Sequence, residues 1–220
     1  MKNSFLFVTA AGLLSASTFS GVKAQGFDIG ARVGANISYY HENAANAPPT
    51  NPSPTTSLVG FVGGIQGDHW FNTSWAISMQ ILYVEKNETF SMESSGRGIS
   101  GLPIFYSINH TYIEIPLEVK LRLLNDASFR PYLFSGITVG WLSSDKRGYV
   151  LYTSLPDATP ITTTIDFGVI GGAGLDYVFP SGASSFIDAG YRVGLINLSK
   201  TVNGSTVNDL RFCAGLLFPL

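Results

Sequence analysis

The feature that most constrains the fold is a strict alternation of apolar and polar residues, repeated along the chain. In residues 27–39 every odd position is apolar or aromatic, and every even position is polar or glycine. Residues 112–123 repeat the pattern, with charged residues such as Glu114 and Lys120 at even positions. A period of two belongs to a β-strand, whose successive side chains point to opposite faces. A helix would spread these charges around its circumference, so we expect a β-protein.

Six further segments alternate less cleanly and raise the expected number of strands to eight. They are residues 58–68, 75–86, 130–142, 165–178, 185–198 and 207–220. Each is near or above the roughly 9–11 residues that a tilted transmembrane strand needs. An even number of such strands is typical of bacterial outer-membrane barrels. The sequence therefore predicts an all-β fold, an eight-stranded antiparallel up-and-down transmembrane β-barrel.

The connections between these segments alternate in length. The long ones, rich in polar residues or proline, are 40–57, 87–111 and 143–164. The short ones are 69–74, 125–129 and 179–184, and the last connection, 199–206, is intermediate. Outer-membrane barrels have short periplasmic turns and longer external loops. We therefore expect both ends of the mature chain to lie in the periplasm.

Residues 1–24 have the features of a secretory signal peptide. Lys2 supplies a positive charge, residues 5–16 form a short apolar run, and Val22 and Ala24 suit a small-residue cleavage site. The apolar run is shorter than the roughly 20 residues of a spanning helix. We expect cleavage after Ala24, which leaves residues 25–220 as a single barrel domain.

Charge is scarce, which narrows the possible partners. Of the 220 residues, 45% are hydrophobic and 13% are charged, whereas ordinary soluble domains have about 25% charged residues. The formal net charge is -2 and no run of Lys and Arg occurs, which excludes a nucleic-acid partner. The single cysteine, Cys213, excludes an internal disulfide and a CxxC metal site. We expect no cofactor and no metal, and outer-membrane lipid as the surroundings.

Alternation alone does not say which face points inward, and a soluble lipocalin-like barrel would bury the apolar face. Two features favour the inverted arrangement. Glycines crowd the polar face, where a narrow barrel needs room for side chains: Gly30, Gly34, Gly60, Gly64, Gly136, Gly140, Gly168, Gly172, Gly174, Gly190, Gly194 and Gly215. Aromatic residues lie near strand ends on the apolar face, as in interfacial girdles: Tyr39, Trp75, Tyr83, Trp141, Tyr177 and Phe218.

Four strand segments resemble those of a known family. They are YIEIPLEVKL (residues 112–121), PYLFSGITVGWL (131–142), DFGVIGGAGLDY (166–177) and GYRVGLINL (190–198). Together with the opening IGARVGANIS they look like the PorT-like outer-membrane β-barrel domain family. The resemblance implies an eight-stranded outer-membrane barrel, and its motifs contain no catalytic signature.

If the polar face lines the lumen, charges of both signs meet there. They are Asp28, Arg32, Glu114, Glu118, Lys120, Arg122, Asp166, Asp176, Asp188, Arg192 and Arg211. An eight-stranded lumen is only wide enough for side chains to fill. We therefore expect a plug of mutually neutralising ion pairs. The alternative is a narrow polar track for ions, or a proton-linked site around Glu114 and Glu118.

A hydrolase at the outer rim is the second alternative, since small barrels can carry chemistry there. It would need a base, and His41 and His110 lie at outer strand ends near Glu42, Asn109 and Glu114. His69 lies at a periplasmic turn. GxSxG, HExxH and phosphate-loop motifs do not occur in a credible context.

The external loops remain as the expected functional surface, so we expect a non-enzymatic barrel with a structural, anchoring or partner-binding role. A protein partner could bind there or at the periplasmic turns. Residues 87–111 include Phe90, Met92, Phe105 and Tyr106. These apolar residues either mark a contact site or extend the neighbouring strands into a hairpin.

Overall fold

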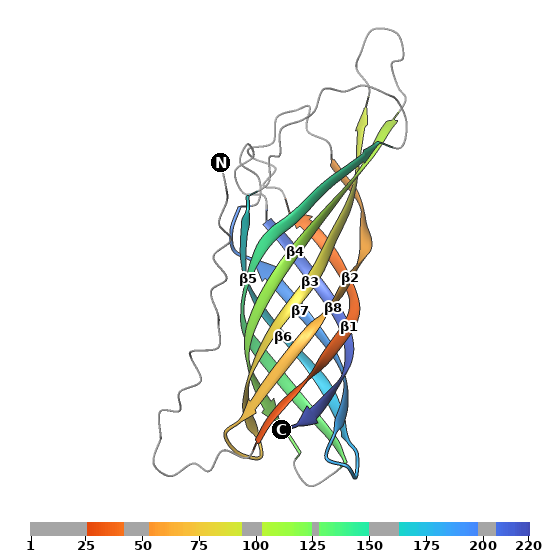
Figure 1. Cartoon of the computed structure of the whole chain (residues 1–220). Helices are drawn as coiled ribbons and strands as arrows, with labels where there is room; N and C mark the ends of the chain where they lie inside the picture. Colours follow the sequence, from red (N-terminus) through yellow and green to blue (C-terminus); the bar gives the residue numbers. More distant parts are fainter. Residues whose placement is uncertain (1–25, 42–52, 94–102, 125–127, 150–162, 198–205) are drawn as a thin grey trace, which may run out of the picture.

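Eight antiparallel strands close into one barrel in the computed structural model (Figure 1). It describes residues 26–41, 53–93, 103–124, 128–149, 163–197 and 206–220. The strands are β1 (Gly26–His41), β2 (Ser53–Trp70), β3 (Trp75–Glu93), β4 (Pro103–Arg122), β5 (Phe129–Tyr149), β6 (Ile165–Val178), β7 (Ser184–Gly194) and β8 (Thr206–Pro219). Each strand pairs with its neighbours in sequence, and β8 closes the barrel on β1. The expected eight-stranded up-and-down topology is confirmed.

Tight connections join β2 to β3, β4 to β5 and β6 to β7 at one end of the barrel, called here the turn end. The C-terminus lies at the same end (Figure 1). The opposite end, called here the loop end, carries the remaining connections. The described ranges contain no helix long and apolar enough to cross a membrane.

Several strands differ in length from the sequence expectation. β3 continues to Glu93, which pairs with Pro103 at the start of β4, and β5 continues to Tyr149. Much of 87–111 and 143–149 is therefore paired strand. Of the two alternatives for residues 87–111, the extension of the neighbouring strands into a hairpin is the one observed. β7 ends earlier than expected, at Gly194.

The two faces of each strand differ sharply in exposure. On β4, Leu117 is 46% exposed on the outer wall, whereas its neighbour Glu118 is 3% exposed in the lumen. The outer wall is apolar on all sides, and most of the buried polar side chains face the barrel interior. A soluble barrel would have the reverse arrangement. The expected inverted topology is confirmed.

Two kinds of crowding account for the lumen glycines. A Cβ atom at Gly30, Gly34 or Gly136 would overlap a backbone carbonyl of the adjacent strand. At Gly174 the nearest atoms would instead be those of the Tyr132 ring. The glycines thus have two roles. They leave room for large side chains, as the sequence predicts, and they also allow adjacent strands to approach closely.

Candidate functional site

The eleven expected lumen residues all lie in the described strands, and all but Asp28, which is half-buried, are buried. Hydrogen bonds and ion pairs divide the lumen charges into two groups. The loop-side cluster consists of Lys86, Glu114, Asp166, Arg192, Asp209 and Arg211. The turn-side group consists of Asp28, Arg32, Asp68, Glu118, Lys120, Arg122, Asp176 and Asp188. Within the described part of the chain, no hydrogen bond or ion pair joins one group to the other.

Lys86 is the centre of the loop-side cluster. Its Nζ lies 3.0 Å from a Glu114 oxygen, 2.7 Å from Asp166 and 3.1 Å from Asp209. These three carboxylates come from β4, β6 and β8, so one β3 lysine ties together four strands. All four side chains are at most 1% exposed.

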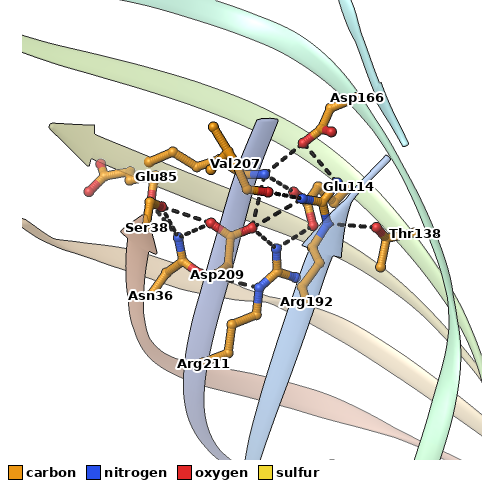
Figure 2. A network of polar contacts seen from close by, with 12 residues as sticks. Asn36, Ser38, Glu85, Glu114, Thr138, Asp166, Arg192, Val207, Asp209 and Arg211 are labelled. Atoms are coloured by element: carbon orange, nitrogen blue, oxygen red, sulfur yellow. Dashed lines mark hydrogen bonds and ion pairs between the residues drawn. The ribbon is translucent and has the colours of Figure 1, made fainter. Parts of the chain in front are cut away.

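Two arginines complete this cluster (Figure 2). Arg192 contacts Asp166 at 2.8 Å and Asp209 at 3.3 Å, and Arg211 contacts Glu114 at 2.7 Å and Asp209 at 3.2 Å. Every carboxylate therefore touches at least two cations. Three cations face three carboxylates, so buried charge is balanced, as burial away from water requires.

Neutral side chains also form hydrogen bonds with the charged residues of the cluster. Arg192 Nε donates to Thr138 Oγ1 at 2.7 Å, and Arg211 Nε donates to Asn36 Oδ1 at 3.2 Å. Ser38 Oγ donates to Asp209 at 2.8 Å. Figure 2 shows these groups converging on Asp209 and Arg192. Fixed partners on several sides hold each charged group in one position.

The turn-side group is built from one-to-one ion pairs, and the amides of Gln66 and Gln80 connect two of these pairs and Glu118 by hydrogen bonds. Arg32 pairs with Asp188 at 2.7 Å, Lys120 with Asp68 at 2.8 Å and Arg122 with Asp176 at 3.1 Å. Glu118 accepts a hydrogen bond from Gln80 at 2.8 Å, and Asp28 accepts one from Trp70 at 2.9 Å. Three cations here face five carboxylates. Asp28 and Glu118 accept from neutral donors in place of a paired cation, and Asp68 and Asp188 accept from Gln66 and Tyr132 in addition to theirs.

Aromatic rings support the cations of the turn-side group. The Arg122 guanidinium lies 3.4 Å from the centre of the Trp70 ring. Lys120 Nζ lies 5.2 Å from the Tyr132 ring centre, and Arg32 lies 5.4 Å from that of Phe186. Such contacts stabilise a cation by about 0.5–2 kcal/mol. The loop-side cluster has such a contact as well, since Lys86 Nζ lies 5.0 Å from the centre of the Tyr112 ring.

Buried apolar side chains of the lumen lie beside both groups. Phe134, Ile170 and Phe186 belong to one buried apolar cluster, and Val62, Leu82 and Cys213 belong to another. A cavity of about 10 Å³ remains, bordered by Arg32 and Arg211 among others. This is about the room that one water molecule needs.

Sequence reasoning missed three lumen charges, Asp68, Lys86 and Asp209. The signal was present, because each lies at the same parity as recognised inward positions, and Asp209 lies two residues before Arg211. The buried amides Gln66 and Gln80 were also missed. Glu118 and Arg122 lie on the same strand but have different partners, Gln80 and Asp176.

The rim constellation considered from the sequence falls partly outside the described residues. His110 is buried and its Nδ1 lies 3.4 Å from Asp145 Oδ1, whereas Glu114 belongs to the loop-side cluster. The side chain of His41 and all of Glu42 lie outside the described residues. Among the side chains that are described, no group of three or more His, Cys, Asp or Glu residues could hold a metal ion.

Comparison with known proteins gives the family. The model of the outer membrane protein β-barrel domain matches residues 16–200. Among solved structures, the outer membrane protein OprG from Pseudomonas aeruginosa is 14% identical, with a TM-score of 0.56 over 90% of this chain and 98% of that chain. Neisserial surface protein A is 17% identical, with a TM-score of 0.45 over 90% and 99% of the two chains.

Comparison with curated proteins finds no match. The OprG likeness shows the fold alone, and the family match accounts for most of the chain. A closed eight-stranded barrel with an apolar outer wall fits the outer membrane, where proteins of this domain lie. The chain is thus an outer-membrane protein and belongs to the outer membrane protein β-barrel domain family.

Proposed function

We propose that this protein is a non-enzymatic, non-conducting barrel that anchors a binding surface in the outer membrane. The observation that carries the proposal is the filled lumen. Ion pairs cross it at two levels, and the cavity between them measures only about 10 Å³. An ion would have to displace several buried, paired charges to pass, which is strongly unfavourable.

The loop end offers the surface for such a role. There β2, β3, β4 and β5 continue as a paired sheet: Ser53 faces Ser91, Glu93 faces Pro103, and Tyr106 faces Tyr149. The adjoining strands end closer to the barrel, with β6 paired to β5 only as far as Trp141. A one-sided sheet is therefore a rigid platform for a protein partner outside the cell.

Planar lipid bilayers test the closed lumen. Purified refolded protein should insert without producing steady single-channel currents, because the two charge groups occupy the path. A barrel variant with Lys86→Ala and Arg192→Ala together controls for insertion, since it removes two large lumen side chains and should raise the conductance. Reproducible open channels in the unmodified protein would contradict the proposal in favour of the narrow pore.

One observation favours a rim hydrolase as the second candidate. His110 and Asp145 form a buried pair at the loop end, and a carboxylate beside a histidine is part of many general-base sites. Lipid deacylation and peptide cleavage by the detergent-solubilised protein test this reading. Activity lost in His110→Gln would make the protein an enzyme, and inactivity on both substrate classes supports the anchor.

Two narrower points belong to the same proposal. Removal of residues 1–24 as a signal peptide would leave the barrel intact, because β1 begins at Gly26. The likeness of four strand segments to PorT-like barrels supports that subgroup within the family.

A further inference from the structure

The small cavity in the lumen touches both charge groups. Arg32, Gln80 and Glu118 border it from the turn side, and Arg211 borders it from the loop side. Cys213 and several apolar side chains complete its wall. This position makes the cavity a point at which a bound molecule could contact both groups.

Two buried N–H groups belong to arginines that line this cavity. Arg32 donates through its Nη atoms to Gln66, Gln80 and Asp188, and its side chain also interacts with that of Cys213, but its Nε has no oxygen or nitrogen acceptor in the described part of the chain. Arg211 donates through Nε and Nη2, while its Nη1 also has no partner there. A buried donor without an acceptor is destabilising and rare, so each calls for an acceptor.

Size and charge select the acceptor. A volume of about 10 Å³ is at the lower limit for one water molecule, which needs two to four polar partners. A cation would be repelled by Arg32 and Arg211, and an anion by Glu118 and Asp188. Water can accept from both arginines and donate to a carboxylate.

We propose that this cavity is a binding site for one water molecule, which accepts hydrogen bonds from Arg32 Nε and Arg211 Nη1 and donates one to Glu118. The water joins the two charge groups into one hydrogen-bonded network across the lumen. The proposal rests on the packing of the lumen, which the proposed function also uses, and it does not depend on whether the barrel conducts.

Nuclear magnetic resonance of the unmodified protein in detergent micelles tests the site. The Arg32 Nε–H should show a magnetisation-transfer peak to a water that exchanges slowly with bulk solvent. A crystal structure should place one solvent peak about 2.7–3.2 Å from both Arg32 Nε and Arg211 Nη1. An empty cavity, an anomalous bromide peak after soaking, or a direct bond from these two groups to protein would overturn the proposal.

A glycine variant sharpens the test. A Cβ atom at Gly190 would lie 3.0 Å from Phe134 and 3.6 Å from Ile170, which all line the cavity, so Gly190→Ala should displace the water and abolish its peak. Gly171→Ala is the matched control, because Gly171 does not line the cavity and its Cβ would meet only the backbone oxygen of Phe134 at 3.7 Å and Ser135 Oγ at 3.8 Å. A water peak of equal strength in both variants would count against the site, and if Gly190→Ala does not fold, the unmodified protein decides.

Conductance separates this proposal from the proposed function. A barrel that conducts ions but retains the water peak would contradict the proposed non-conducting lumen and would still support the water site. A silent barrel without the water peak would contradict the site alone.

Discussion

The loop-side cluster and the turn-side group neutralise buried charge in different ways. At the loop side, Lys86, Glu114 and Asp209 are parts of a mesh in which each carboxylate touches two or more cations. At the turn side, the ion pairs are one-to-one, such as Arg32 with Asp188, and neutral amides rather than shared charges connect them. Removing one charged residue from the loop-side cluster therefore affects several ion-pair partners, whereas removing one from a turn-side pair affects a single ion-pair partner.

The difference concerns strand closure as well as charge. Asp209 and Arg211 lie on β8, the strand that closes the barrel on β1, and they contact β3 and β4 across the lumen as well as the neighbouring β7. The mesh therefore links the last strand to strands that are not its neighbours in the sheet. We infer that the loop-side cluster contributes more to barrel closure than the turn-side group does.

The largest effect is expected from Asp209→Asn. The change leaves three buried cations with two carboxylates, and breaking a buried ionic network typically costs about 3–5 kcal/mol. Urea unfolding in lipid vesicles, followed by tryptophan fluorescence, measures the free energy of unfolding. Asp176→Asn is the control in the turn-side group, where one pair is lost. If the two variants are equally destabilised, the cluster is no more than a set of pairs.

A smaller loss is expected from Arg32→Met. Asp188 loses its cation but keeps the hydrogen bond from Tyr132 Oη at 2.9 Å, so the cost should be about 1–3 kcal/mol. The same unfolding measurement applies, with Arg32→Lys as the variant that retains the charge. A loss as large as that of Asp209→Asn would show that the turn-side group is also a mesh.

Coupling within a pair should be measurable at the turn side. Removing Arg122 and Asp176 together should be less damaging than the sum of the single changes, with a coupling energy of about 0.5–3 kcal/mol. A double-mutant cycle with Arg122→Met and Asp176→Asn gives this value. Strict additivity would mean that the 3.1 Å contact contributes nothing.

The smallest effect is expected from Glu118→Gln. The hydrogen bond from Gln80 can persist on the new carbonyl oxygen, and one of five turn-side carboxylates is removed, so the change should stay below about 1.5 kcal/mol. Unfolding midpoints in urea check it against the unmodified protein. A loss above 3 kcal/mol by this measure would mean that Glu118 is a required ion-pair partner.

The sequence predicts the two faces of each strand well, because parity alone decides them. Leu117 and Glu118 are adjacent in sequence, and the two-residue period sends one to lipid and the other to the lumen. Strand ends were predicted less well. Beyond the membrane the outer face need not be apolar, so the alternation fades after Lys86 although β3 continues to Glu93.

Partners in the lumen could not be predicted from the sequence. Lys86 and Asp166 are 80 residues apart, and their contact depends on the shear between strands, which parity does not give. For the same reason, closeness on one strand does not make Glu118 and Arg122 a pair. Most opposite charges meet here across the barrel, and Asp209 with Arg211 is an ion pair along one strand.

The matched lysines test the contrast between the two groups most directly. Lys86 contacts three carboxylates and Lys120 contacts one, so Lys86→Met and Lys120→Met remove the same charge from a mesh and from a pair. Urea unfolding of both variants in the same vesicles should show Lys86→Met to be less stable by at least about 1 kcal/mol. Equal stability, or a greater loss in Lys120→Met, would contradict the account.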